Sequence, residues 1–176
     1  MGLTMDFKPE RSVYLDGEIN GHTCAEAMMG ISKLYSADQE APITLFISSG
    51  GGNVSDAFAL YDYVMTALRP NLQTVALGEA NSVAVILFLM GEKRYVGNLT
   101  ILKLHEFSFT PEGSSSVTAR GARKMAKSLE LSQTKYADII ANRSGIPKRK
   151  VRALMRKKTT ILPAQAVELG LAHQVL

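Results

Sequence analysis

A short apolar run followed by a segment of helical character occurs three times in the first half of the chain, and this alternation restricts the fold more than any other feature. The runs Ser12–Leu15, Ile43–Ile47 and Leu72–Leu77 have the length and β-branched content of buried strands. Strands that alternate with helices are joined by right-handed crossovers into a mainly parallel sheet. We therefore predict one domain of the α/β class over residues 1–176.

The helices expected after these strands are Thr23–Tyr35, Val54–Leu68 and Val83–Gly91. No periodicity is present in Met1–Arg11, which we expect to be a loosely held terminus, and Thr110–Ser116 is expected to be a polar loop. The rest of the pattern predicts strands at Arg94–Val96 and Leu99–Leu104, helices at Val117–Asn142 and Pro147–Lys158, an extended Thr159–Leu162 and a last helix over Pro163–Gly170.

The segment Val117–Asn142 is unusually long for a domain of 176 residues. At about 1.5 Å per residue it would approach 40 Å, so part of it has to protrude. A protruding helix needs a partner to cover its apolar stripe, and a second copy of the chain is the simplest one. We therefore predict self-assembly through this helix.

Composition narrows the class of protein. Hydrophobic residues make up 46% and charged residues 20%, as in ordinary globular proteins. Cys24 is the single cysteine, so no intrachain disulfide forms. The sequence has no secretory signal pattern and no apolar run near the roughly 20 residues that span a membrane. We expect a soluble, cytoplasmic protein with no membrane contact.

The net charge of +4 is unevenly distributed. One stretch of sixteen residues carries +8 and no acid, so the rest of the chain is at about −4. A nucleic-acid surface is one interpretation, but no aromatic residue interleaves the charges. We favour a solvated or subunit-facing helix surface and no nucleic-acid partner. The basic residues are Arg143, Lys148, Arg149, Lys150, Arg152, Arg156, Lys157 and Lys158.

Two turns that follow strands carry the candidate chemistry. In a parallel sheet such turns gather at the carboxyl edge of the strands. Gly50–Gly52 lets backbone N–H groups approach a substrate closely, and it lacks the Lys-Ser/Thr that a phosphate-binding P-loop needs. Ser82 follows a strand expected to end at Gly78 and precedes an apolar helix, whose unpaired N–H groups suit a nucleophile that generates an oxyanion. The alternative is a serine that caps the helix.

A serine nucleophile needs a base, and the chain has three histidines. His105 ends a strand that follows the serine helix, so it can emerge at the same edge of the sheet. His22 lies at the start of the first helix and is expected at the surface or in a cap. His173 is near the C-terminus and is expected to be exposed.

Five segments, in this order, resemble the proteolytic subunit of the Clp protease, with similarity from about Glu10 to the C-terminus. They are Ile47–Val54, Tyr61-Asp62, Gly78–Ala84, Leu104-His105 and Pro163–Leu171. The resemblance implies a crotonase-like fold of stacked ββα units with residues 117–142 as a protruding handle helix. It also implies a serine endopeptidase with Ser82 as nucleophile, His105 as general base, and the backbone N–H groups of Gly52 and Val83 as oxyanion donors. Neither a cofactor nor a metal is implied.

The resemblance further implies partners. In the family the handle helix joins two rings of seven subunits, and the rings enclose the active sites. An ATP-driven unfoldase of the AAA+ class delivers unfolded polypeptides to them. For this chain we therefore expect ring assembly, stacked heptamers, and unfolded polypeptide substrates.

The sequence departs from the family pattern at the third catalytic position. The family aspartate falls at Lys158 or Thr159, and neither is a carboxylate. Ser82 and His105 could act as a dyad, or a threonine hydroxyl or a backbone carbonyl could orient the imidazole. Glu106 and Asp138 are other candidate acids. A second departure is Gly50, which replaces the usual proline and is expected to loosen the glycine turn.

Two other functions remain open on the same scaffold. One is an acyl-CoA hydratase or hydrolase, in which the glycine turn would hold a thioester oxyanion; the Ser82/His105 pair and the short chain argue against it. The other is a catalytically impaired ring subunit that serves assembly or regulation, for which the missing aspartate is the reason.

Overall fold

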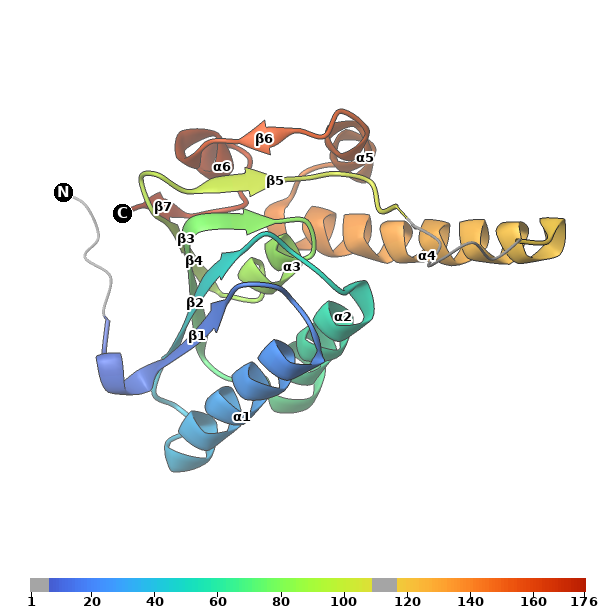
Figure 1. Cartoon of the computed structure of the whole chain (residues 1–176). Coiled ribbons are helices and arrows are strands. Elements are labelled where there is room, and N and C mark those ends of the chain that lie inside the picture. Colours follow the sequence, from blue (N-terminus) through green and yellow to red (C-terminus); the bar gives the residue numbers. More distant parts are fainter. Residues whose placement is uncertain (1–6, 109–116) are drawn as a thin grey trace.

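The computed structural model describes residues 7–108 and 117–176 (Figure 1). The expected polar loop at Thr110–Ser116 lies outside these residues. The helices are η1 (Pro9–Arg11), α1 (Gly21–Ala37), α2 (Val54–Asp62), η2 (Tyr63–Leu68), α3 (Ala84–Phe88), α4 (Ala119–Ser144), α5 (Lys148–Arg156) and α6 (Pro163–Glu168). The strands are β1 (Ser12–Asp16), β2 (Ile43–Ser49), β3 (Leu72–Asn81), β4 (Lys93–Val96), β5 (Ile101–Lys103), β6 (Thr160–Ile161) and β7 (Gln174–Val175).

The strands form one mainly parallel sheet, which confirms the predicted α/β class. The order β1-β2-β3-β4-β7 is parallel throughout, β5 pairs in parallel with β3, and β6 adds to β5 in the antiparallel direction. The strand β7 was not expected from the sequence. It is only two residues long, and it exists because Tyr95 and Val96 of β4 offer a free edge to Gln174 and Val175.

The strand β3 does not end at Gly78, so that expectation was wrong. Gly78 has φ +68°, a left-handed conformation that glycine adopts without steric cost, and the strand continues to Asn81. Before Gly78 the strand pairs with β4, and after it the strand pairs with β5, from Glu79 beside Ile101 to Asn81 beside Lys103. The change of partner brings the end of β3 next to the end of β5.

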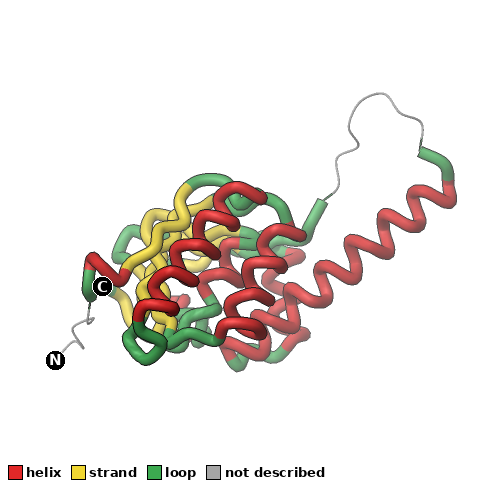
Figure 2. The backbone as a smooth tube through the Cα atoms, turned by 90° about the horizontal axis from the view of Figure 1, so that it is seen from below, coloured by secondary structure: helices red, strands yellow, loops and turns green. Residues whose placement is uncertain are grey.

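The helix α1 packs on the strands β1 and β2, and α2 packs against α1 and α3. Figure 2 shows from below that helices cover this side of the sheet. Each of α1 and α2 buries one apolar stripe, for example Cys24, Ala27 and Ile31 of α1, against a core to which all five residues of α3 contribute. Fully burying an aliphatic side chain contributes about 1.5–3 kcal/mol. The expected helix Val54–Leu68 is present, but its second half, η2, has π-helical geometry.

The helix α4 protrudes from the rest of the molecule in both views (Figures 1 and 2). Its 26 residues give a length of about 39 Å. The half nearer its C-terminus is packed, with Tyr136, Ala137 and Ile140 buried. In the other half the apolar side chain of Met125 is exposed, and Leu131 near the middle is 57% exposed. The prediction of a long helix with an uncovered apolar stripe is therefore confirmed for the single chain.

Arginine side chains tie down the ends of several elements by donating to backbone carbonyls. Arg94 is 5% exposed and donates to the carbonyls of Leu171, Gly91, Gly170 and Arg143. Burial, reinforced by the nearby positive charge of Arg143, lowers the pKa of Arg94 to about 10.

The end of the N-terminal segment is also held by an arginine. Arg11 donates to the carbonyls of Leu34, Asp38, Ala41 and Pro42. The expectation of a loose terminus up to Arg11 was therefore wrong at that residue. None of the described helices is long and apolar enough to cross a membrane.

Candidate active site

Ser82 directly follows β3 and has φ +54°, a conformation that non-glycine residues seldom adopt and that costs on the order of 1–3 kcal/mol. Its backbone is held from several directions. The N–H donates to the carbonyl of Lys103 (2.9 Å), and the carbonyl accepts from the Tyr136 hydroxyl (2.8 Å) and from the N–H of Val85 (3.1 Å). These bonds compensate the strained conformation and fix where the side chain points.

The hydroxyl of Ser82 does not cap the helix, so the capping alternative was wrong. The N-cap position of α3 is Val83, and no side chain makes a cap hydrogen bond there. Ser82 is 8% exposed, and its hydroxyl has no hydrogen-bond partner among the described residues. Strained serine turns of this kind occur at nucleophiles, so the geometry is compatible with the role expected for Ser82.

The glycine turn after β2 lies against Ser82. Gly51 has φ +101°, and a Cβ built on it would stand 2.7 Å from the Cβ of Ser82 and 3.3 Å from its Oγ. Gly52 has φ +152°, and a Cβ there would stand 2.2 Å from the carbonyl oxygen of Ile19. Both positions therefore require glycine. The turn is held by a bridge in which Ile19 donates to Gly51 (2.9 Å) and accepts from Asn53 (2.7 Å).

The two N–H groups expected to act as oxyanion donors lie on these two turns. The bridge to Ile19 uses the carbonyl of Gly51 and the N–H of Asn53, and the N–H of Gly52 has no partner among the described residues. Val83 follows Ser82 at the start of α3, where backbone N–H groups lack intrahelical acceptors, and its N–H is also unpaired in the described part of the chain. Neither N–H is therefore used by another described residue.

His105 lies two residues beyond β5 and is half-buried. Because β5 runs parallel to the second half of β3, with Asn81 beside Lys103, the chain reaches Ser82 and His105 at the same edge of the sheet. Nδ1 of the imidazole is 2.7 Å from the backbone carbonyl of Glu106. A carbonyl only accepts, so Nδ1 carries the proton, and in the neutral ring Nε2 is left free to take one.

The other two histidines lie elsewhere. His22 is exposed in the first turn of α1 and is 3.4 Å from Glu26. The ring of His173 accepts from the backbone N–H of Arg94 (3.1 Å). Burial, together with the positive charges of Arg94 and Arg143, lowers the pKa of His173.

Lys158 lies next to the residues that pair with the segment leading to His105. The strands β5 and β6 pair with Leu102 beside Ile161 and Lys103 beside Thr160, and the N–H of Leu104 donates to the carbonyl of Thr159 (3.0 Å). The ladder ends there, because the N–H groups of Thr159 and Lys158 donate to carbonyls of α5, those of Leu154 and Met155. Lys158 has φ +50° and is exposed.

The other candidate orienting groups are engaged elsewhere. The Thr159 hydroxyl donates to Leu154 (2.9 Å), and Asp138 pairs with Lys148 (2.5 Å). Glu106 contributes its backbone carbonyl and not its carboxylate. Among the described residues no carboxylate hydrogen-bonds to His105, so of the options left open by the sequence the backbone carbonyl is the one present.

Three residues that sequence reasoning did not assign to the site reach it from the packed half of α4 and the segment after His105. The ring of Phe107 packs on the ring of Tyr136, with centroids 5.0 Å apart, and Tyr136 in turn bonds Ser82. The N–H of Phe107 donates to Oε1 of Gln133 (3.3 Å). Tyr136 is fully buried, which strongly raises the pKa of its hydroxyl and keeps it a hydrogen-bond donor. Only the apolar stripe of the long helix pointed to Tyr136.

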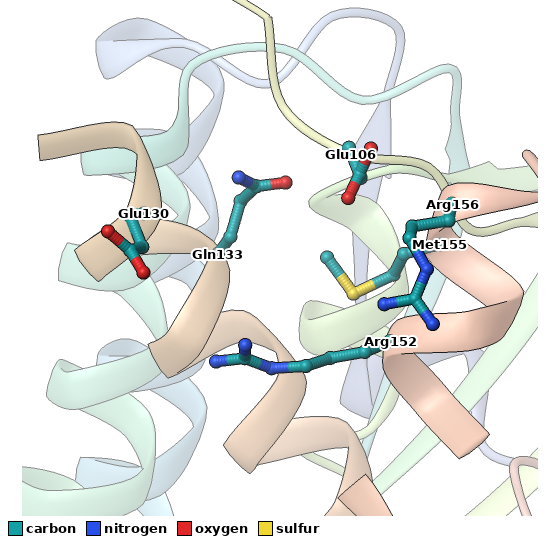
Figure 3. Close-up of a pocket in the computed structure, with 6 residues that line it drawn as sticks. All are labelled: Glu106, Glu130, Gln133, Arg152, Met155 and Arg156. Carbon is teal, nitrogen blue, oxygen red and sulfur yellow. The ribbon is translucent and has the colours of Figure 1, made fainter. Parts of the chain in front are cut away.

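A cavity of about 70 Å³ opens beside His105–Phe107, which we call the histidine segment, between α4 and α5 (Figure 3). Side chains of both charges point into it, and no ion pair forms between them. Its lining residues are Glu106, Glu130, Gln133, Arg152, Met155 and Arg156. Within the described residues no group of three or more potential metal ligands occurs.

Comparison with known proteins places the chain among proteases. A family model described as Clp protease matches residues 3–176. The ATP-dependent Clp protease proteolytic subunit of Dehalococcoides mccartyi is 29% identical over 172 residues, which cover 95% of this chain and 82% of that protein. The corresponding subunit of Borreliella afzelii is 27% identical over 169 residues, covering 95% and 83%. Subunit 4 of Streptomyces avermitilis is 28% identical over 173 residues, covering 95% and 73%.

The family model extends over nearly the whole chain, and it includes both turns and the histidine segment described above. The relatives match over a similar extent. The chain therefore belongs to the Clp protease family.

Proposed function

We propose that this chain is a serine endopeptidase that cleaves unfolded polypeptides inside a ring chamber, as a proteolytic subunit of a Clp-type protease. Family membership supports a peptide-bond hydrolase. The single observation that carries the serine mechanism is the contact between Gly51 and Ser82, because it joins a strained serine to a turn that supplies backbone donors. No described feature favours an acyl-CoA substrate.

In the proposed mechanism Nε2 of His105 removes the hydroxyl proton while Oγ of Ser82 bonds to the carbonyl carbon of the scissile peptide. The carbonyl π electrons move to oxygen and form a tetrahedral oxyanion. When the C–N bond breaks, the imidazolium returns the proton to the leaving amine. Water, deprotonated by the same imidazole, then bonds to the acyl carbon, and the imidazolium returns the proton to Oγ of Ser82 as the C–Oγ bond breaks.

The N–H groups of Gly52 and Val83 would hold the oxyanion. One such donor lowers the barrier by about 3–4 kcal/mol in related chemistry. Their lack of partners among residues 7–108 and 117–176 supports this role. The glycine conformations matter for the same reason, since a side chain at Gly51 or Gly52 would displace the turn from Ser82 or from Ile19.

The imidazole is proposed to work in a dyad with Ser82, oriented by the carbonyl of Glu106 instead of by a carboxylate. A hydrogen bond to a neutral carbonyl is about half as strong as one to a charged acceptor. The dyad therefore stabilises the imidazolium less than a triad would, and we expect slower acylation than in a subunit that has the acid.

The exposed stripe of α4 supports assembly through this helix, and we propose that two rings, as stacked heptamers, meet along it. An AAA+ unfoldase that supplies unfolded chains is the proposed partner, and the cytoplasm is the proposed location. The relatives named as ATP-dependent Clp protease subunits support the ATP-driven partner.

Lys158 supports a second candidate function, a catalytically impaired ring subunit. A protonated lysine is not a hydrogen-bond acceptor, so Lys158 cannot orient the imidazole as the family aspartate would. Such a subunit would assemble and contact substrates but would not cleave them.

Labelling with a fluorophosphonate separates the two functions. We expect the assembled wild-type protein to be labelled at Ser82 and to cleave an unfolded model polypeptide, and Ser82→Ala to abolish both. An assembled, folded wild-type protein that takes no label would support the impaired subunit. Mass measurement in solution tests the assembly: a stable monomer of 19.1 kDa would contradict it.

A further inference from the structure

The peptide unit between Glu106 and Phe107 is hydrogen-bonded on both sides. Its carbonyl accepts from Nδ1 of His105 (2.7 Å), and its N–H donates to Oε1 of Gln133 (3.3 Å). The two groups of a trans peptide point in opposite directions in one plane. Fixing the N–H therefore fixes the direction of the carbonyl that holds the imidazole.

We propose that Gln133 is a positioning residue for His105, which acts through the Glu106–Phe107 peptide in the place of the missing acid. The proposal rests on the proposed function for its catalytic consequence, while the placement of the imidazole stands apart from it. Gln133 contacts no reacting atom. It holds the peptide, the peptide holds Nδ1–H, and Nε2 is thereby presented with its lone pair free.

The packing of α4 fixes the place from which the Gln133 side chain projects. The side chain projects from the packed half of α4, one turn before Tyr136, on the same face of the helix. Tyr136 is fully buried and bonds the carbonyl of Ser82, so this part of α4 is anchored to the serine turn. The ring contact between Phe107 and Tyr136 brings the histidine segment onto the same anchor.

Hydrogen bonds in a chain polarise one another, so the bond from Phe107 to Gln133 strengthens the carbonyl of Glu106 as an acceptor. A stronger acceptor at Nδ1–H raises the nucleophilicity of Nε2 and holds the ring in one orientation. Charged side chains of the cavity lie nearby, namely Glu130, Arg152 and Arg156. Within the described residues none of them makes a hydrogen bond or ion pair to His105 or to this peptide, and Arg152 donates to Thr134 instead.

The test uses Gln133→Met, which keeps the length of the side chain and removes the acceptor, and Gln133→Glu, which keeps the acceptor oxygen. Asn142→Leu is the matched control, because it exchanges an exposed amide for an apolar side chain of similar size on the same helix. All proteins are compared as the full-length assembly, with melting temperature and native mass as controls of folding.

Two rates are measured. One is carbethoxylation of each histidine by diethyl pyrocarbonate at constant pH, resolved by peptide mass spectrometry, with His22 and His173 as internal references. The other is the second-order rate constant of fluorophosphonate labelling at Ser82. For Gln133→Met we expect the His105 carbethoxylation rate to fall about fivefold, the effect of one neutral hydrogen bond, and the labelling rate to fall about tenfold. Gln133→Glu is expected to restore both to within about threefold, and Asn142→Leu to change neither.

Unchanged rates in Gln133→Met, or equal losses in Gln133→Met and Gln133→Glu, would overturn the proposal. If Gln133→Met fails to assemble, Gln133→Asn, whose oxygen is one methylene short, replaces it against Gln133→Glu with the same expectations. The carbethoxylation rates test the positioning role even if the wild type is not labelled by the fluorophosphonate. If the His105 carbethoxylation rate then depends on Gln133, the positioning role is supported although the proposed peptidase function fails. If instead the wild type takes the label and neither rate changes in the Gln133 variants, the peptidase function is supported and the positioning role is wrong.

Discussion

Ser82 and the glycine turn are held by backbone hydrogen bonds to several other elements, whereas His105 is held by a bond to its own neighbour. We call Gly51 and Gly52 with Ser82 and Val83 the serine half of the site, and His105–Phe107 with Gln133 the histidine half. In the serine half, hydrogen bonds to the backbone groups of Ser82 and Gly51 and two glycines with positive φ determine one geometry. In the histidine half the imidazole depends on one carbonyl, which itself depends on α4.

This difference has a consequence for mutation. The serine half is part of the folded core, so changes there should affect folding and activity together. The histidine half is held to that core by fewer hydrogen bonds, so changes there should alter activity with little loss of stability. Four predictions test the contrast.

The largest effect is expected from Gly52→Ala in the serine half. Its Cβ would lie 2.2 Å from the carbonyl oxygen of Ile19, at a φ of +152°, so the turn must move. We expect peptide cleavage to fall about 10²–10³-fold through loss of an oxyanion donor, with a lower melting temperature. Gly50→Ala is the matched control, since its Cβ would stand 3.4 Å from the Glu79 carboxylate. Equal activity of the two variants would refute the role of the Gly52 N–H.

Outside the two halves, Lys158→Asp should increase activity. It restores a carboxylate at one of the two positions where the family aspartate falls, at a left-handed φ that aspartate tolerates better than most residues. We expect the fluorophosphonate labelling rate to rise about tenfold, a part of the roughly 10⁴-fold effect of such an acid elsewhere. Lys157→Asp makes the same charge change one residue away. A similar gain in Lys157→Asp would show that the change in charge, and not a carboxylate at position 158, raises the labelling rate.

Tyr136→Phe tests the link between the two halves. It removes the hydrogen bond to the carbonyl of Ser82 and keeps the ring contact with Phe107. The unfolding free energy should fall by about 1 kcal/mol and the labelling rate by about fivefold. Tyr14→Phe, at an exposed tyrosine, should change neither quantity. A loss of stability without a slower rate would show that the Ser82 carbonyl needs no such support.

The smallest effect should come from His173, which lies in neither half. Burial and the positive charges of Arg94 and Arg143 hold its pKa below the ordinary 6.5. The unfolded chain therefore binds the proton more readily, and stability that is fully present above pH 6.5 is lost as pH falls through the folded pKa. Melting temperatures between pH 8 and pH 5 should show a drop that His173→Gln reduces. The same slope in His173→Gln would assign the pH dependence to other groups.

Much of the fold could be predicted from local patterns. The helix and strand types followed from apolar spacing, and the parallel sheet followed from their alternation. The pairing of strands beyond that was not predictable. Residue Gly78 was interpreted as the end of a strand, because nothing local shows that β5 will pair with the residues that follow it. The short strand β7 arises in the same way, from a free edge provided by β4.

In the candidate site, too, local sequence indicated some residues and not others. The residues Ser82, Gly52 and His105 could be selected as candidates from the sequence, because serine, glycine and histidine at strand ends are informative residue types. The contributions of Gln133 and of the Glu106 carbonyl were not, since a glutamine on a helix and a backbone carbonyl carry no distinctive signal. The carboxylates offered by the sequence, Glu106 and Asp138, are not used by the imidazole in the described structure.

The sequence by itself determined the α/β class, the long helix, the two turns and the absence of a carboxylate at Lys158, because each depends on residue type and local spacing. Tertiary structure decided which strands pair around Gly78, that Ser82 is strained and not a cap, and that α4 reaches both halves of the site. These features depend on contacts between residues far apart in the chain, such as Tyr136 with Ser82 and Gln133 with Phe107. Such contacts form only when the sheet and α4 have packed together.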